Sequence, residues 1–179
     1  MSKIFSKNIE RYLNSFGKYV VKQARTNLTK GKKNVSKSLY ESIKYDFVIE
    51  NNGDFNLQFK MDYYGQFVDK GVSGNEKKRT YKDWQGKTVS SPYAYTNKQP
   101  PSSILTKWIK MRGIKGRDSK TGRFISNKTL AFLIGRKIKR DGIKGISFFQ
   151  RPLELSMKKF PKEFGAELKQ DIIDTLNNK

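Results

Sequence analysis

Apolar side chains at three- and four-residue spacing predict an amphipathic helix near the N-terminus. Polar residues fill the intervening positions, and Gly31 follows where such a helix would end. The sequence therefore predicts a helix over about residues 5–29. A second, shorter helix is predicted over Val35–Ile43, with Asn34 as its N-cap. The apolar positions of the first helix are Ile9, Tyr12, Leu13, Phe16, Val20, Ala24 and Leu28.

A pattern with an apolar residue at every second position follows these helices. It runs through Tyr45–Ile49 and again through Phe55–Met61, and the segment Asn51–Asp54 between them has the composition of a tight turn. This pattern predicts a β-hairpin with one apolar face. We expect the first helix to cover that face because it is the nearest apolar stripe in the chain.

The middle of the chain has a different character. Residues 71–101 lack sustained periodicity and are expected to form a long excursion. A helix is predicted after Pro101, with Ile104, Leu105, Trp108, Ile109 and Met111 on its apolar face and its end at Gly113, and residues 113–125 are expected to form a basic turn or ribbon. A further helix is predicted from an N-cap at Asn127 to about Arg140, with Leu130, Phe132, Leu133, Ile134 and Ile138 facing inward.

The last apolar stripe predicts a C-terminal helix that begins near Pro161. Its apolar positions are Phe160, Phe164, Leu168, Ile172, Ile173 and Leu176. Together these elements predict an α+β fold in which a small, mostly antiparallel sheet is packed by the N- and C-terminal helices. We expect one domain over residues 1–179, with a core of 1–71 and 145–179 and a basic insertion at 72–144. The expected core residues are Leu13, Phe16, Val20, Phe47, Ile49, Leu57, Phe59, Phe148, Leu168 and Ile172.

The charge is concentrated in that insertion. The 179 residues hold 38 Lys and Arg and 16 Asp and Glu, a formal net charge of +22, and 20 of these bases but four of the acids lie between Glu76 and Arg151. Such a field attracts a polyanion, either nucleic acid or an acidic protein face, although a solvated insertion has the same composition. The candidate contacts to DNA or an acidic partner are Lys77, Lys78, Arg79, Arg117, Lys120, Arg123, Arg136, Lys137, Lys139 and Arg140.

Composition also restricts the chemistry of the chain. It has no Cys and no His, which excludes thiolate and imidazole catalysis and the usual zinc sites. The acids in or beside the hairpin, Asp46, Glu50, Asp54 and Asp62, lack a matching acid and lysine on the second strand and do not predict a magnesium site. We therefore expect no enzymatic activity, no cofactor and no metal. The longest apolar stretches are also too short for a membrane helix, so no membrane partner is expected.

Aromatic residues are interleaved with bases in and near the excursion. Tyr81, Trp84, Tyr93 and Tyr95 are candidates for a subunit or partner interface, with base stacking on single-stranded nucleic acid as the less favoured role.

Two segments resemble a known family. The first is Met61-Asp62-Tyr63-Tyr64-Gly65-Gln66-Phe67-Val68-Asp69-Lys70-Gly71, and the second is Gly145-Ile146-Ser147-Phe148-Phe149-Gln150-Arg151-Pro152-Leu153, which precedes a long helix. Their order resembles the tail-completion or neck proteins of tailed bacteriophages, in which a "YA-x-Y-V-E-x-G-T"-like stretch and a later "P-F-L-x-P-A"-like stretch precede the last helix. The matching residues are Tyr64, Phe67, Val68, Asp69, Gly71, Phe148, Phe149 and Pro152.

The chain departs from the family pattern at Gly65, Val72 and Leu153, and its insertion is longer than in short members of the family. A purely structural role for the matching residues, closing a core and forming turns, is the alternative. The resemblance implies a structural virion protein, assembled in the host cytoplasm, that forms a homo-oligomeric ring at the head-tail junction. Its implied partners are other copies of itself, the portal, adaptor and tail proteins, and packaged duplex DNA.

The resemblance further implies interface roles for Tyr64, Phe67, Asp69, Gly71, Phe148, Phe149 and Pro152. A tail-terminator ring and a basic DNA-binding protein outside the virion remain the alternatives to a neck subunit.

Overall fold

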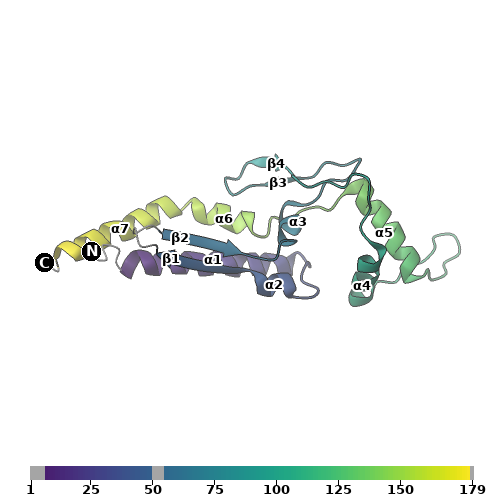
Figure 1. The fold of residues 1–179 in the computed structure, drawn as a ribbon, viewed down its shortest axis with the longest axis horizontal. Coiled ribbons are helices and arrows are strands. Elements are labelled where there is room, and N and C mark those ends of the chain that lie inside the picture. The colour runs from purple at the N-terminus through teal and green to yellow at the C-terminus, as the bar shows by residue number, and fades with distance from the viewer. Residues whose placement is uncertain (1–6, 50–54, 178–179) are drawn as a thin grey trace. The chain divides into compact units, whose positions relative to one another are not determined.

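The computed structural model describes residues 7–49 and 55–177 (Figure 1). Helices and short antiparallel strands make up an α+β fold, as the sequence predicts. The elements in chain order are α1 Lys7–Lys30, α2 Ser38–Ser42, β1 Lys44–Ile49, β2 Phe55–Lys60, α3 Gly65–Lys70, β3 Thr80–Lys82, β4 Thr88–Ser90, α4 Ser102–Arg112, α5 Asn127–Asp141, α6 Gln150–Met157 and α7 Phe160–Asn177.

The chain divides into two compact units. The first unit comprises Met1–Gly65, Lys82–Lys87 and Ser147–Lys179, and the second comprises Gln66–Tyr81 and Thr88–Ile146. The second unit therefore begins six residues before the insertion expected at 72–144 and ends two residues after it, while the tip of the β3–β4 hairpin belongs to the first unit.

In the first unit, α1 packs against both strands of the β1–β2 hairpin and against α6 and α7. The apolar stripe of α1 is buried as predicted at Ile9, Leu13, Val20 and Leu28. The hairpin is antiparallel, from Lys44 opposite Lys60 to Ile49 opposite Phe55. Helix α1 accordingly lies on the hairpin, as predicted from their apolar faces, whereas the turn predicted at Asn51–Asp54 lies outside the described residues, as does the side chain of Ile49.

Aromatic rings join α1 to α7. The ring centroids of Phe16 and Phe160 lie 5.2 Å apart in an edge-to-face arrangement, and those of Tyr12 and Phe160 lie 5.8 Å apart. Phe164 stacks on Phe160 at 5.2 Å. Because large rings bury much apolar area in few residues, this cluster holds the terminal helices together.

A buried carboxylate completes the same contact. Asp171 of α7 is 2% exposed, and its oxygens accept hydrogen bonds from the backbone N–H groups of Asn8 (3.3 Å) and Ile9 (3.1 Å). It also accepts one from Nδ2 of Asn8 at 2.6 Å. A carboxylate is favoured there because the first N–H groups of a helix lack partners within the helix and carry partial positive charge.

In the second unit, α4 and α5 form a helical pair. Leu105 and Ile109 of α4 and Ala131 of α5 are its buried centre, with Ile114 and Leu130 packed around them. Ser126 is the N-cap of α5, and its side chain accepts a hydrogen bond from the N–H of Thr129, so the cap predicted at Asn127 is wrong by one residue.

Several other predictions are corrected. Helix α2 begins at Ser38 after Lys37 in a left-handed conformation, so Asn34 does not cap it. Residues 71–101 contain the β3–β4 hairpin, and α3 was not predicted. Phe132, Leu133, Ile172 and Ile173 are substantially exposed, not inward-facing, and the same holds for Ile104, Trp108 and Met111. Phe47, Leu57, Phe59 and Leu168 are only partly buried.

Candidate partner-binding surfaces

The two segments that resemble neck proteins meet through their backbones within the second unit. Val72 and Ile143 exchange both backbone hydrogen bonds, at 2.9 and 2.7 Å, and the N–H of Ile146 donates to the carbonyl of Val68 at 3.1 Å. The roughly 70 residues between Val72 and Ile143 thus begin and end at one antiparallel backbone pair. The insertion is therefore an excursion from a single point of the chain.

Glycine is required at this junction. A Cβ on Gly71 would lie 2.6 Å from the backbone nitrogen of Gly145, and one on Gly145 would lie 2.5 Å from the carbonyl oxygen of Asp69. Gly71 also has a positive φ of 76°, which other residues rarely adopt. The glycine of the first segment is thus explained by backbone packing against the second.

Most of the other matching residues pack inside the chain. Asp69 is 3% exposed and Phe148 is fully buried, while Phe149 packs edge-to-face on Phe59 at 5.3 Å. Pro152 is also buried. This burial argues against the interface roles expected for Asp69, Gly71, Phe148, Phe149 and Pro152, because it leaves little side-chain surface for a neighbouring subunit. Tyr64 remains accessible, with 42% of its surface exposed.

The aromatic residues of the excursion have mixed roles. Tyr93 packs edge-to-face on Phe67 at 4.6 Å and its hydroxyl donates to Gln66. Its segment is held by Ser73, which exchanges backbone hydrogen bonds of 2.8 Å with Tyr93 and Tyr95. Trp84 is exposed and Tyr81 and Tyr95 are half-buried, and burial raises the pKa of Tyr95. Trp84, which is 45% exposed, is the most accessible of these four aromatic residues.

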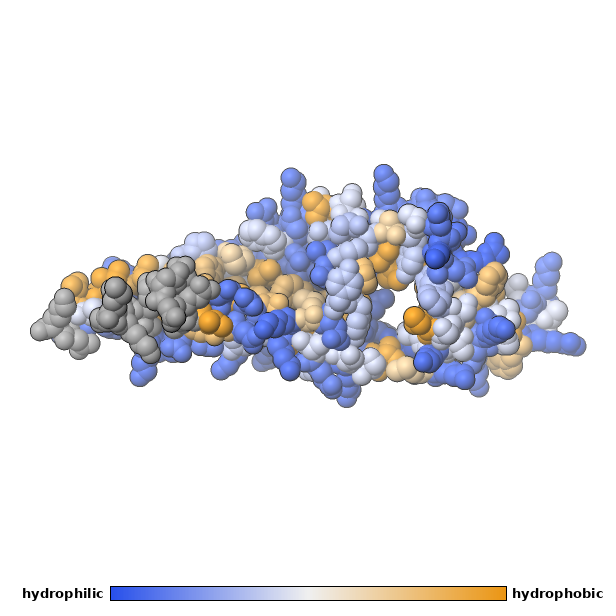
Figure 2. Space-filling model, in the orientation of Figure 1, coloured by the Kyte–Doolittle hydropathy of each residue, from blue (hydrophilic) through white to orange (hydrophobic). Residues whose placement is uncertain are grey.

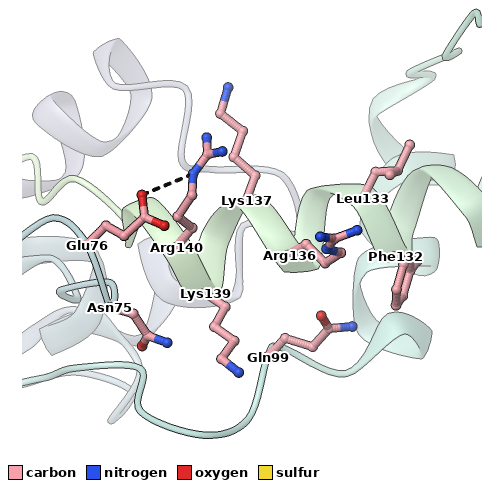
Figure 3. Close-up of a pocket in the computed structure, with 9 residues that line it drawn as sticks. All are labelled: Asn75, Glu76, Gln99, Phe132, Leu133, Arg136, Lys137, Lys139 and Arg140. Atoms are coloured by element: carbon pink, nitrogen blue, oxygen red, sulfur yellow. Dashed lines mark ion pairs between the residues drawn. The ribbon is translucent and has the colours of Figure 1, made fainter.

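An open groove lies along the C-terminal half of α5 (Figure 3). Its volume is about 650 Å³, and Figure 3 shows Lys139 and Gln99 reaching into the same space, whereas Lys137 extends to the other side of the helix. Nζ of Lys139 donates to the carbonyl of Asn97 at 2.9 Å. Phe132 and Leu133 contribute apolar surface to the groove.

The charge of Arg140 is paired with acidic side chains of the same chain. It forms two hydrogen bonds with Asp141, at 2.9 and 3.1 Å, and lies 3.9 Å from Glu76. The hydrogen bond from Arg140 is the main cause that lowers the pKa of Asp141. Two of the four cations predicted on this helix for DNA or an acidic partner are therefore already engaged, and Arg136 and Lys137 are the more available pair.

The other predicted cations are spread over two loops. Lys77 lies 4.0 Å from Asp141, Lys78 is exposed, and Nε of Arg79 is buried without a hydrogen-bond partner. Arg117, Lys120 and Arg123 lie together on an exposed hairpin between α4 and α5. That hairpin brings together three of the predicted contacts, all of them exposed.

Each unit also carries an exposed apolar stripe on a helix. Ile104, Trp108 and Met111 lie on one side of α4 and are 62%, 37% and 58% exposed. Ile172, Ile173 and Leu176 form a second stripe on α7. In Figure 2 hydrophilic side chains cover most of the visible face, and apolar side chains are visible along α7. Exposed apolar side chains in a line are typical of contact surfaces between proteins.

Among residues 7–49 and 55–177, no three His, Cys, Asp or Glu side chains cluster as metal ligands would. The described candidate acids have structural partners: Asp46 pairs with Lys60, and Asp62 accepts a hydrogen bond from Ser38. Glu50 and Asp54 lie outside the described residues. No helix in the described part of the chain has both the length and the apolarity to cross a membrane.

The sequence pattern did not mark three acids that organise this structure. Asp171 anchors α1, Asp141 holds Arg140, and Asp118 caps the turn of the exposed hairpin. Lys120, Thr121 and Gly122 follow Asp118 at two to four residues. Of the three acids, Asp118 is therefore the one whose local sequence indicates a turn. No family model, curated protein or solved structure matches the chain.

Proposed function

We propose that this protein is a structural, non-catalytic subunit of a tailed bacteriophage that assembles into a ring and joins the head to the tail. The observation that supports the proposal best is that the two family-like segments meet at the hydrogen bond from Ile146 to Val68, next to the Val72–Ile143 pair. Because the insertion leaves and returns at that pair, the helix, hairpin and motif order of the neck proteins is preserved around it. The neck assignment itself comes from the resemblance of those two segments.

Self-association has independent physical support. The stripes on α4 and α7 expose large apolar side chains on a molecule of high net charge. A second copy of the chain is a natural cover for such a stripe, because burial of apolar area stabilises association and rings form when one surface of a subunit binds a different surface of the next.

The decisive experiment is electron microscopy of virus particles that lack this protein. We expect DNA-filled heads and separate tails, and restoration of joined particles when purified protein is added. Intact infectious particles without the protein would end the proposal. Joined heads with tails of uncontrolled length would favour the tail-terminator alternative.

A matched pair of variants tests assembly. Ile172→Asp/Leu176→Asp places two charges on the α7 stripe and should abolish rings seen by sedimentation and microscopy. Val48→Asp changes a comparably exposed residue on β1 and should leave assembly intact. Equal behaviour of the two variants would show that the α7 stripe is not a subunit contact.

A further inference from the structure

The loop between α4 and α5 is an ordered hairpin formed by residues 115–125, here called the basic hairpin. The N–H of Ile125 donates to the carbonyl of Gly116 at 3.0 Å, and that of Asp118 donates to Arg123 at 2.9 Å. These bonds flank the pair Arg117–Phe124, which is therefore a non-hydrogen-bonded antiparallel pair with its side chains close together on one face.

The turn of the basic hairpin is closed by its one acid. Oδ1 of Asp118 accepts hydrogen bonds from the N–H groups of Lys120 (3.0 Å) and Thr121 (2.8 Å) and from Oγ1 of Thr121 (3.0 Å). These bonds lower the pKa of Asp118, so its carboxylate stays ionised and tied to the turn. Gly122 supplies the positive φ, 69°, that the turn needs.

One face of the basic hairpin is fixed to the helical pair. A Cβ on Gly116 would lie 2.9 Å from Ile125 and 3.0 Å from Leu130, so the glycine allows these two side chains to approach the backbone. Leu130 and Ile114 in turn pack on the buried centre of α4 and α5. The hairpin is thus held by apolar contacts at its base.

The opposite face presents ordered cations. The guanidinium of Arg117 lies 4.4 Å from the centroid of the Phe124 ring, and Nζ of Lys115 lies 5.9 Å from it. This cation–π contact with Phe124 restrains the Arg117 side chain on the exposed face. Lys120 and Arg123 lie at the tip and are exposed. Four cations therefore project from a span of nine residues.

The surrounding sequence reinforces this charge. Residues 102–128 contain eight bases and one acid, Asp118, a net charge of 8 − 1 = +7. On α5, by contrast, the cations of the groove are partly satisfied by Asp141 and Asn97. On the basic hairpin, the bases Lys115, Arg117, Lys120 and Arg123 are accompanied by one acid, Asp118, whose carboxylate is bonded to the turn.

We infer that the basic hairpin binds duplex DNA through phosphates on the two sides of a groove. A two-stranded ribbon fits the major groove of DNA, which is about 12 Å wide. Residues two apart on one strand of the ribbon, such as Lys115 and Arg117, are about 7 Å apart. An acidic protein surface is the less suitable partner because Phe124, the one large apolar side chain on the exposed face, lies against Arg117 and Lys115. Because the contacts are to phosphates, binding has no strong sequence preference.

The test is titration of a fluorescent duplex with full-length protein at several salt concentrations. In Arg117→Gln/Lys120→Gln/Arg123→Gln we expect the Kd to rise at least about tenfold and the log–log salt slope to fall by about 2 to 3. The control Lys18→Gln/Lys30→Gln/Lys169→Gln removes the same charge from exposed helix positions of the first unit. Its Kd should change less than about threefold.

Equal weakening by the two triple variants would overturn the inference, since net charge alone would then explain binding. Hairpin-dependent binding to poly-glutamate that is tighter than binding to DNA would overturn it in favour of an acidic protein. If the triple variant misfolds by circular dichroism, Lys120→Gln/Arg123→Gln changes only the exposed tip. These results do not depend on ring assembly, so the inference and the proposed function can fail separately.

Discussion

Asp171 shows how one side chain can join the two ends of the chain. Its oxygens accept hydrogen bonds from two backbone N–H groups of α1, although Asp171 lies about 160 residues away in sequence. A buried carboxylate is costly unless it is hydrogen-bonded, and here the donors are the groups that α1 cannot satisfy itself. The interaction therefore fixes the register of α7 on α1.

Asp171→Ala should lower the free energy of unfolding by about 2 to 4 kcal/mol, because the buried N–H of Ile9 and the partly buried N–H of Asn8 would lose their acceptor. Urea denaturation followed by circular dichroism measures this change. Asp174→Ala is the control, since Asp174 accepts only from the side chain of Asn8 in this contact and should cost under about 1 kcal/mol. Similar losses in the two variants would contradict the proposed anchoring role.

Tyr12 makes the stability of the α1–α7 contact depend on pH in the alkaline range. Its hydroxyl donates to Glu163 at 3.1 Å, and burial together with this carboxylate raises the pKa of Tyr12 to about 12. Since the folded-state pKa lies above the usual 10.0, the stabilisation is complete below pH 10.0 and is lost as the pH rises through about 12. The stability difference between wild type and Tyr12→Phe should shrink over this range in urea titrations. Parallel curves would contradict this assignment.

At the scale of elements, the junction of the two motif segments requires glycine for a reason that does not apply to every glycine of the chain. Gly71 and Gly113 both have positive φ, 76° and 63°. A Cβ on Gly71 would meet backbone atoms at 2.6 Å, whereas nothing lies within 4 Å of one on Gly113. The two positions therefore separate the cost of backbone conformation from that of a steric clash.

Gly113→Ala should cost about 1 kcal/mol from its left-handed conformation alone. Gly71→Ala should cost at least about 2 kcal/mol more, because the backbone of Gly145 or Ile143 must move. Equilibrium unfolding of both variants measures the difference. Equal costs would mean that the junction yields easily and does not hold the insertion in place.

The same scale explains what the sequence could predict. The period of α1 and the alternation of the β1–β2 hairpin identified both elements because each has one apolar face. In α5 the apolar residues surround the helix: Phe132 lies about 200° around the axis from Leu130, so both cannot face α4. The centre of the contact uses Ala131 and Gly135, small residues that allow close approach and carry no strong hydrophobic signal, and the predicted Leu130, Ile134 and Ile138 pack around it.

The candidate surfaces were less predictable than the fold. The basic residues were found from composition, but their availability depends on partners that no local pattern reveals, such as Asp141 for Arg140. The exposure of Ile172 follows from the burial of Asp171, one position earlier on α7. Asp171, a polar residue, occupies the inward position on α7. The apolar stripe of α7 faces outward as a result.

At the scale of the whole molecule, the insertion can be removed at one defined point. Val72 and Ile143 form a hydrogen-bonded antiparallel pair, the geometry that a two-residue hairpin turn closes. Residues 73–142 can therefore be replaced by Asn-Gly without stretching the backbone. The excised segment has 18 bases and four acids, so the net charge falls by 18 − 4 = 14, from +22 to +8.

We expect this shortened chain to fold even though it loses Lys82–Lys87 of the first unit, because the α1–α7 aromatic cluster, the Asp171 anchor and the β1–β2 hairpin of that unit all remain. Near-ultraviolet circular dichroism should retain the signal of the packed Tyr12, Phe16 and Phe160 rings, and urea unfolding should remain a single transition. Adding Asp171→Ala to the shortened chain should cost the same as in full-length protein, because the hydrogen bonds of the anchor go to Asn8 and Ile9 of α1. A shortened chain that aggregates or loses its aromatic signal would show that the first unit needs the insertion to fold.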